Sequence, residues 1–454
     1  MIKPVKLKPC FHAGLIICFL LFSQVSFTQE ARKFSLEEAI KFALENNYDA
    51  LNASKDLTIA KKQVREATAI GLPQVNATAN FQNFLDIPTQ VLPANAFNPQ
   101  ADPDQLVPIR FGTDYTAQGA LEASQIIFDG AYIVGLKASK TFQLFSRQNL
   151  QRTKADVANE VKQAYFNALV ARENYEINEN TYENIEKNLS ETKIMFEEGF
   201  SEEQDVEQLE LTLLNLKNAL NRADRQREIS EKLLKFRLGI DVEEMIELTD
   251  ELETFTESLT NKNHTSGEVN INDHIDYKVA DTRVELDNLS LQRERSEYLP
   301  KLNAFFSYRQ DAFRNDLEFT DTDGWFPATI WGVNLSVPIF SSGMRHSKVQ
   351  QAKIEMEKSK TDRDMMEQNI RLQIATARKD FEVAEETYHN QKKSMDLSER
   401  ILNKTLVKHQ EGVASSFELT QMQNQFLEAQ GNYINALFDL MNAKAALDRA
   451  LGRM

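Results

Sequence analysis

Val157-Ala-Asn-Glu-Val-Lys-Gln-Ala-Tyr-Phe-Asn-Ala-Leu-Val-Ala-Arg-Glu-Asn-Tyr175 is the stretch that decides the fold class. Its apolar and small residues recur alternately four and three positions apart, at Val157, Val161, Ala164, Ala168, Ala171 and Tyr175. This spacing predicts a coiled-coil seam whose small side chains let helices pack closely. No proline occurs from Gly130 to Gly199. At 1.5 Å per residue, an unbroken helix over this range is about 100 Å long. The chain therefore has to form a rod or a tube.

The chain contains this pattern twice. The same spacing returns at Ile370, Ile374, Ala377, Phe381, Ala384 and Tyr388. A shared Leu-Pro-x-x-Asn-Ala sequence starts at Leu72 and again at Leu299. Three glycine pairs have one common offset of 213 residues: Gly130 and Gly343, Gly199 and Gly412, Gly239 and Gly452. A register kept through both long helices indicates a tandem duplication.

Each half has the same order of predicted elements. A helix (residues 35–69 and 272–298) ends at a Leu-Pro break, because proline cannot continue the helical hydrogen bonds. Two strands joined by a loop follow, and then a very long helix, a glycine and a second helix. We expect residues 29–240 to form the first repeat, residues 241–270 an acidic equatorial linker, and residues 271–454 the second repeat.

The strand predictions rest on alternation. Apolar side chains alternate with small or polar ones in each segment, most clearly in the second half: Trp331, Val333, Leu335, Val337 and Ile339; Leu302, Ala304, Phe306 and Tyr308; and, more weakly, Val75, Ala77, Ala79 and Phe81; Leu121, Ala123, Gln125 and Ile127. A period of two predicts one apolar and one polar face. Half-buried strands of a soluble sheet fit this pattern as well.

The predicted loops between the strands are long. Residues 86–112 contain five of the 11 prolines, and residues 311–329 carry Trp325 and Phe326. Long loops with aromatic residues at their base are typical of the outer side of a membrane barrel. Four strands cannot close a barrel, and an open edge would leave unpaired backbone groups in lipid. Several chains must then contribute, in a number that the pattern does not give.

The N-terminus predicts export. Lys3, Lys6 and Lys8 precede the apolar run from Gly14 to Phe22, so residues 1–28 fit a signal peptide; a retained anchor helix is the alternative. Both cysteines lie in this segment, which leaves a mature chain without disulfides or thiolate metal sites. No later segment has the ~20 apolar residues of a membrane helix. The net charge of −16 excludes nucleic acid as a natural partner.

With its two repeats, its paired Leu-Pro-x-x-Asn-Ala segments and its Gly-x-x-Ser-x-x-Glu type turns, the mature chain resembles the TolC family of outer-membrane efflux proteins. The resemblance implies a mainly α fold with a small β part, in which long coiled-coil helices accompany four transmembrane β-strands. It implies a homotrimer with a twelve-stranded barrel in outer-membrane lipid and a helical duct in the periplasm. It also implies passive export, in a tripartite efflux or type I secretion system, of substrates delivered by an inner-membrane pump and a periplasmic adaptor protein.

The ends of the two predicted helical hairpins are the candidate contact sites. A glycine permits the left-handed stop of each long helix, and Ser201 or Ser415 can cap the returning helix. Simple hairpin turns are the alternative to a binding role. The resemblance implies that the adaptor contacts these tips, at Gly199, Phe200, Ser201, Gly412, Val413, Ala414 and Ser415.

The resemblance also implies a periplasmic constriction. An aspartate pair of the family matches Glu418 and Gln421, which are three residues apart and so share a helix face. Because Gln421 is neutral, we expect a single ring of carboxylates and weaker cation binding. A solvated helix residue is the alternative for Glu418. Asp205 holds the matching place in the first repeat and is expected to tie neighbouring hairpins together.

No pattern in the sequence points to catalysis. The six histidines show no metal-ligand spacing, and there is no phosphate-binding glycine loop, Gly-x-Ser-x-Gly turn or cysteine nucleophile. We therefore expect no enzyme, cofactor or metal site. A soluble periplasmic coiled-coil protein and an envelope hydrolase are the competing classes, and the cargo of a duct (drug, metal ion or secreted protein) is not encoded in these patterns.

Overall fold

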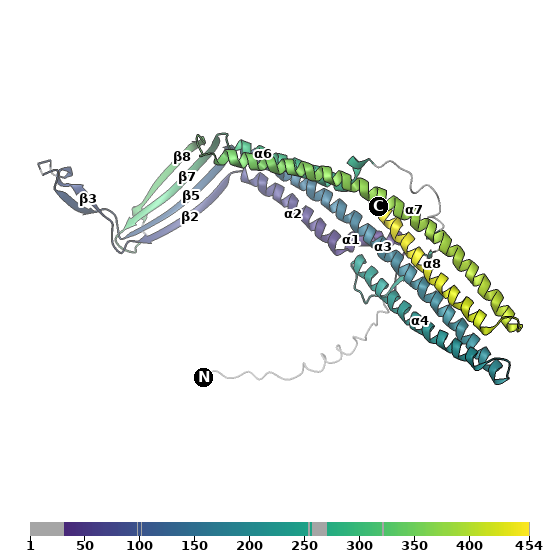
Figure 1. Cartoon of the computed structure of the whole chain (residues 1–454). Helices are drawn as coiled ribbons and strands as arrows, with labels where there is room; N and C mark the ends of the chain where they lie inside the picture. The colour runs from purple at the N-terminus through teal and green to yellow at the C-terminus, as the bar shows by residue number, and fades with distance from the viewer. Residues whose placement is uncertain are drawn as a thin grey trace, which may run out of the picture.

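The computed structural model describes residues 31–97, 99–100, 102–252, 255–256, 270–319 and 322–453. The molecule is elongated, with a sheet at one end and long helices that run away from it (Figure 1). The helices are α1 (Leu36–Asn46), α2 (Tyr48–Ile70), α3 (Gly130–Glu197), α4 (Glu203–Leu238), α6 (Ile275–Ser296), α7 (Met344–Gln410) and α8 (Ser416–Ala450). The expected signal peptide, residues 1–28, lies outside the described residues.

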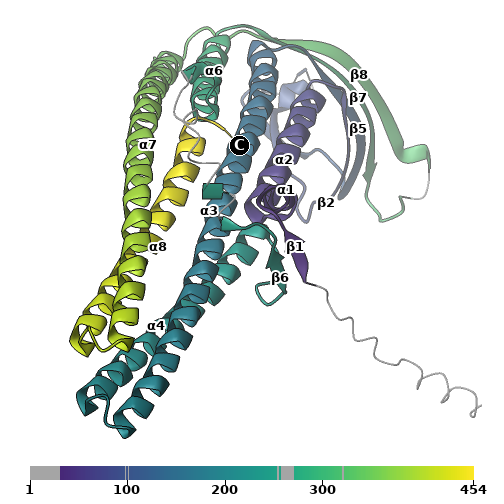
Figure 2. The ribbon, with the colours of Figure 1, turned by 90° about the vertical axis from the view of Figure 1, so that its right-hand side faces the viewer.

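The two long helices confirm the prediction from the seam spacing. Helix α3 has 68 residues and α7 has 67. Every seam residue of the two helices is buried except Ile374 and Tyr175, which are half-buried. Near the sheet the helices pack in the order α2, α3, α6, α7, and farther away in the order α4, α3, α8, α7 (Figure 2). The predicted fold class, mainly α with a small β part, is therefore correct.

The first predicted helix is in fact two helices. Asn47 separates α1 from α2, and its side chain accepts hydrogen bonds from the N–H groups of Asp49 and Ala50. Its Nδ2 donates to the carbonyl of Arg237 at 2.9 Å. Gly239, with a φ of +80°, lies so close to the Asn46 carbonyl that a Cβ there would be 2.3 Å from the oxygen. The break comes from this contact with the end of α4, and a helical pattern along the sequence cannot reveal it.

Four antiparallel strands form the main sheet in the order β2-β5-β7-β8. Their bounds are β2 (Gln74–Asn83), β5 (Tyr115–Phe128), β7 (Lys301–Arg314) and β8 (Trp325–Ser336). The register places Val75, Ala123, Phe306 and Trp331 opposite one another, so they share one face. This face is open in the single chain, where Trp331 is 79% exposed. The alternation predicted from sequence thus extends across all four strands.

The other face of the sheet carries a row of polar side chains, next to a few apolar ones such as Phe305 and Ile330. Asn76, Glu122 and Ser307 are opposite one another on it, one position along from the apolar row. Gln118 donates from Nε2 to Asp311 at 2.9 Å, and Arg309 forms an ion pair with Asp311 at 3.1 Å. A sheet with one apolar and one hydrogen-bonded polar face is suited to separate lipid from water.

Two loop predictions need correction. Strand β7 continues to Arg314 and β8 starts at Trp325, so Trp325 and Phe326 lie in a strand and the second loop is shorter than expected. Residues 86–112 contain a separate hairpin of β3 (Thr89–Pro93) and β4 (Leu106–Arg110), beyond the main sheet in Figure 1. A long loop without strands was expected there. Both strands of a two-stranded ribbon are edge strands, however, and edge strands tolerate proline.

A short parallel sheet of two strands lies on one side of the helices, beside α1 and α4 (Figure 2), and the sequence did not predict it. Strand β1 (Arg32–Phe34) pairs with β6 (Ile246–Leu248), which lies in the expected linker; residues 253–254 and 257–269 of that linker are outside the described part. The Tyr165 hydroxyl on α3 donates to the Phe34 carbonyl at 2.9 Å and to Asp250 at 3.0 Å. These bonds attach the two strands to the long helix.

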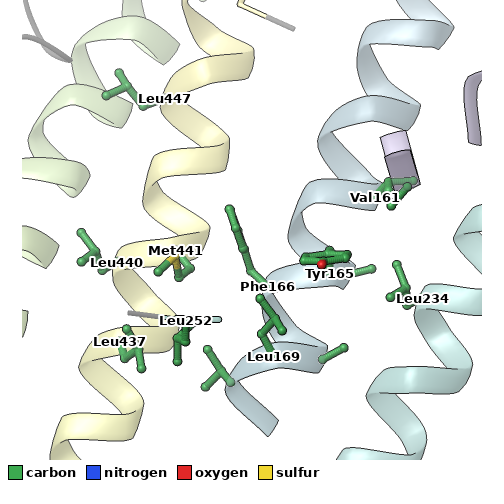
Figure 3. Close-up of a cluster of buried hydrophobic side chains, with 14 of the residues drawn as sticks. Val161, Tyr165, Phe166, Leu169, Leu234, Leu252, Leu437, Leu440, Met441 and Leu447 are labelled. Carbon is green, nitrogen blue, oxygen red and sulfur yellow. The ribbon is translucent and has the colours of Figure 1, made fainter. Parts of the chain in front are cut away.

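The main core lies at the same level. Apolar side chains from α3, α4 and α8 meet there together with Leu252 from the segment after β6 (Figure 3). The fully buried members labelled in Figure 3 include Val161, Tyr165, Leu169, Leu234, Leu437, Leu440, Met441 and Leu447. This core joins the helices of the two halves into one body.

Candidate functional site

The candidate tips are at the ends of the helices that lie farthest from the sheet (Figure 1). In the first hairpin Gly199 has a φ of +78°. Its N–H donates to the Phe196 carbonyl at 3.0 Å, and the Phe200 N–H donates to the Met195 carbonyl at 2.8 Å. These two bonds form a Schellman motif, which satisfies the last carbonyls of α3. The predicted left-handed glycine stop is confirmed here.

The second hairpin ends in the same way. Gly412 has a φ of +74°, and its N–H donates to the His409 carbonyl at 2.9 Å. The Val413 N–H donates to the Lys408 carbonyl at 2.8 Å. The His409 ring nitrogen Nδ1 is 3.0 Å from the Ala414 carbonyl, a contact that closes this turn further.

The two returning helices start differently. Ser415 caps α8 as predicted, because its Oγ accepts the Glu418 N–H at 3.2 Å. The first cap prediction, at Ser201, is wrong: α4 is capped at Glu202, whose N–H donates to Asp205 at 3.1 Å. Ser201 donates its hydroxyl proton to the same carboxylate at 2.8 Å. An acid three residues into the helix thus takes over the capping role.

The tips present apolar side chains to solvent. Phe200 is 80% exposed and Val413 is 77% exposed, whereas Ala414 is buried in its turn. Phe417, in the first turn of α8, is exposed as well. The sequence analysis did not single out Phe417, although an aromatic residue in the first turn after a hairpin glycine is a usable signal. Each tip thus exposes an aromatic residue, and exposed apolar side chains of this kind are common at protein contact surfaces.

Glu418 and Gln421 lie in the first two turns of α8. Both are exposed, while Leu419 and Thr420 between them are buried. The two side chains therefore share the solvent side of the helix. Asp205, at the first hairpin, is bound within its own turn to Ser201 and Glu202. A contact between Asp205 and a neighbouring hairpin stays a prediction.

An ion network links α3, α6 and α8, and no sequence pattern pointed to it. Arg449 bonds to Asp156 at 2.7 Å and to Asp276 at 3.1 Å. Asp448 pairs with Lys162 at 3.0 Å and with Lys444. Burial alone would raise the pKa of Asp448, but hydrogen bonds and charge from Lys444 and Lys162 lower it overall. The residues come from sequence positions up to 293 apart, so no local pattern connects them.

His274 is the titratable side chain through which we expect this region to respond to acid. It is buried, and its Nδ1 accepts the Asp276 N–H at the start of α6. Burial lowers the pKa of His274 below its ordinary value, so the folded state favours the neutral ring. The contribution of neutral His274 to folding stability is complete above the pKa of about 6.5 that histidine has in the unfolded chain. It is lost as the pH falls toward the lower pKa of His274 in the folded state.

We therefore expect the thermal midpoint of unfolding to decrease when the pH is lowered from 7 to 5. His274→Asn keeps a capping oxygen but does not titrate, so it should reduce this fall. Circular dichroism melts of both proteins at the two pH values measure the effect. An equal decrease in wild type and variant would exclude His274 as the titrating group.

Two cavities lie between the helical hairpins. One, of about 590 Å³, is a solvent-open groove lined by α3, α4 and α8. The other, of about 400 Å³, is a solvent-open groove lined by α3, α7 and α8. Leu427 and Gln430 of α8 contribute to both, so the cavities adjoin. In the described part of the chain, no helix is long and apolar enough to cross a membrane. The same residues contain no group of three or more metal-binding side chains.

A sheet with one apolar face, continued by long helical hairpins, is the architecture of one class of protein, the protomer of an outer-membrane channel. The outer membrane efflux protein family model matches residues 39–239 and 273–453, and the chain belongs to this family. Members of the family are outer-membrane channels and not enzymes, and the chain is accordingly a channel protein of the outer membrane with helices that extend into the periplasm.

Individual relatives agree with this assignment. The outer membrane efflux protein BepC of Brucella suis is 20% identical over 347 residues, which cover 75% of this chain and 74% of BepC. The Campylobacter jejuni CmeC outer membrane channel superposes with a TM-score of 0.74 at 19% identity, over 92% of this chain and 85% of CmeC. The open state of the Neisseria gonorrhoeae MtrE outer membrane channel superposes with a TM-score of 0.71 at 18% identity, over 92% of this chain and 89% of MtrE.

Proposed function

We propose that three copies of this chain close into a channel that passively exports substrates across the outer membrane. The sheet edges support ring closure. Within the described residues, β2 and β8 each pair on one side only. Because the sheet has an even number of alternating strands, β8 of one copy can pair antiparallel with β2 of the next. Such a ring leaves no open edge in lipid.

The helices offer matching edges on the same two sides. Near the sheet the outer helices are α2 and α7, and near the tips they are α4 and α7. Helix α7 carries a row of exposed apolar residues: Ile354, Met365, Leu372 and Val383. Helix α4 exposes Leu211, Leu214 and Ile229, and α2 exposes Ile59. Contact of α7 with α2 and α4 of the next copy would bury both sets and would continue the barrel as a helical duct.

We assign the chain, in this assembly, to a tripartite efflux or type I secretion system. The observation that carries the proposal is the exposure of apolar side chains at both hairpin tips, Phe200 at the first and Val413 and Phe417 at the second. A periplasmic adaptor protein would bind there and connect the channel to an inner-membrane pump. The repeats, residues 29–240 and 271–454, would supply equivalent hairpins around the duct, with residues 241–270 as the equatorial linker.

The test uses the absence of cysteine after residue 18. Ser415→Cys, labelled with a photo-crosslinker in cells, should capture a periplasmic adaptor that mass spectrometry identifies. Because Ser415 is an exposed tip residue, the label reaches whatever binds the tip. Ser394→Cys, an exposed position farther along α7, is the matched control and should capture no adaptor. Capture of the chain's own copies alone would contradict the adaptor contact and retain the oligomer.

Glu418→Ala tests the proposed constriction. Three Glu418 carboxylates at the duct entrance would attract cations, so we expect lower cation selectivity of the purified channel in planar bilayers. The effect should weaken at high salt, because exposed charges are screened beyond about 10 Å at 0.1 M ionic strength. Glu203→Ala removes an exposed carboxylate at the tip of the other hairpin and should leave selectivity unchanged. Equal selectivity of wild type and Glu418→Ala would place Glu418 outside the pore.

A further inference from the structure

Helices α4 and α7, which form the two outer edges of the chain toward the tips, each carry a second apolar stripe. The exposed residues of the stripe on α4 are Leu211, Leu214, Ile229, Leu233 and Phe236, and those on α7 are Leu372, Val383, Leu397 and Ile401. Both stripes lie away from the buried residues through which the helices pack inside the chain, such as Leu234 on α4 and Phe381 on α7. A helix that is apolar on two sides is suited to packing against partners on both.

Contacts between α3 and α8 show how far the two hairpins are shifted along the rod relative to each other. Gln430 donates from Nε2 to the Thr181 hydroxyl at 3.4 Å, and each residue is 18 positions from the glycine at the tip of its hairpin. Lys162 and Asp448, which pair at 3.0 Å, are 37 and 36 positions from the same two glycines. Residues equally distant from the two tip glycines therefore lie at the same level along the rod.

At equal levels the apolar stripes of α4 and α7 match residue by residue. Leu214 on α4 and Leu397 on α7 are both 15 positions from the tip glycines of their hairpins. Ile229 is 30 positions away and Val383 is 29. Because α3 and α8 lie between α4 and α7, these residues cannot meet within one chain. They can meet between the α7 edge of one copy and the α4 edge of another.

Arg225 and Glu386 place opposite charges at one level of the same two stripes. Each is 26 positions from the tip glycine of its hairpin. Both are exposed, and neither forms a salt bridge with a residue that the structure describes. Complementary charges on two surfaces favour the contact in which they face each other and disfavour shifted ones.

The sheet end of the chain supports the same contact independently. A Cβ on Gly130, at the start of α3, would be 2.7 Å from Leu299 Cδ1, so the two halves touch closely there. Gly343 holds the equivalent place before α7, but a Cβ on it would meet no described atom within 4 Å. Leu72, the equivalent of Leu299, is 55% exposed. The contact that joins the two halves of one chain is thus open to repetition between Gly343 and Leu72 of the next copy.

We propose that α7 of one copy packs along α4 of the next at equal levels, with Glu386 in an ion pair with Arg225 of the next copy. The leucine contact lies on the tip side of this pair, and the isoleucine–valine contact lies on its other side. The interface is head-to-tail, because each copy uses two different edges, so the chains can close into a ring. The inference rests on the proposed channel and adds to it the register of the copies and the charged pair that sets this register.

Disulfide trapping tests the register, because no cysteine occurs after residue 18. A chain with both Ile229→Cys and Val383→Cys, oxidised with copper phenanthroline in isolated outer membranes, should form covalent dimers and trimers that a reductant dissolves. The matched control combines Ile229→Cys with Leu372→Cys, which lies on the same stripe 11 positions farther along α7. That shift is about 16 Å, beyond the reach of a disulfide, so the control should remain monomeric on a denaturing gel.

Charge reversal tests the ion pair. Arg225→Glu and Glu386→Arg should each raise the dissociation rate of the purified oligomer about tenfold, because like charges then face each other across the interface. The double variant should return the rate to that of wild type. Lys217→Glu makes the same charge change at an exposed position of α4 outside the stripe, and we expect it to leave the rate unchanged.

The two experiments separate the register from the channel itself. An oligomer that is trapped equally by both cysteine pairs, or that the double reversal does not restore, would overturn the register and leave the channel in place. A wild-type chain that stays monomeric in the outer membrane would contradict the channel and the register together.

Discussion

Phe306→Lys is expected to prevent stable assembly in the outer membrane. Phe306 lies near the middle of β7, opposite Ala123 and Trp331 on the apolar face of the sheet. A lysine on the lipid face of a membrane barrel costs about 2–4 kcal/mol at the bilayer midplane. Three copies in one barrel would each bear this cost. The amount of heat-modifiable oligomer in the outer-membrane fraction measures the loss.

The neighbouring residue provides the control. Ser307 follows Phe306 in the same strand but lies on the polar face, opposite Glu122. Ser307→Lys introduces the same charge at the same depth, where water and a carboxylate are available. We expect its abundance to remain close to that of wild type. If Phe306→Lys and Ser307→Lys accumulate equally, the apolar face does not contact lipid.

Leu437→Ala is expected to weaken the packing between the two helical hairpins and so to lower the stability of the protein. Leu437 is 0% exposed and lies on α8 in the core where α3, α4 and α8 meet (Figure 3). Removal of a buried leucine side chain costs about 2–5 kcal/mol, because lost burial and a residual cavity add together. The thermal midpoint of the helical signal should fall markedly, and hydrogen exchange in α8 should increase.

A surface position on the same helix separates this effect from a general loss of helix stability. Asp439 is exposed two residues after Leu437. Asp439→Ala should change the free energy of unfolding by no more than about 0.5 kcal/mol. A comparable destabilisation by both substitutions would mean that the core around Leu437 does not hold the hairpins together.

The sequence predicted those parts of the molecule that follow from local periodicity. The four-three spacing around Val157 and Ile370 became two long helices, since an apolar stripe defines a helix independently of its partners. Alternation around Trp331 became a strand with one apolar face. Glycines 199 and 412 ended the long helices because only a left-handed residue satisfies the last carbonyls in this way. Each of these predictions needs only neighbours within one or two turns of the chain.

Other features were visible only in part. Ser415 was recognised as a cap, but Ser201 was not distinguished from its neighbour Glu202, because the choice depends on where the Asp205 carboxylate lies. The β3–β4 hairpin was hidden by its prolines. The sequence predicted that Glu418 and Gln421 share one side of a helix. It did not show whether that side points into the pore of an assembled channel. The roles of Glu418, Gln421 and Asp205 therefore stay predictions.

By itself, the sequence determined the duplication, the rod-like helices, the two-faced strands and the class of protein. Tertiary structure alone decided which distant groups meet. Contact with the end of α4 ends the first helix at Asn47, and β1 pairs with the distant β6. Arg449 forms ion pairs with Asp156 and Asp276, which lie on other helices. The physical reason is that periodicity reports which side of an element is apolar, whereas polar contacts depend on the positions of atoms from segments hundreds of residues apart.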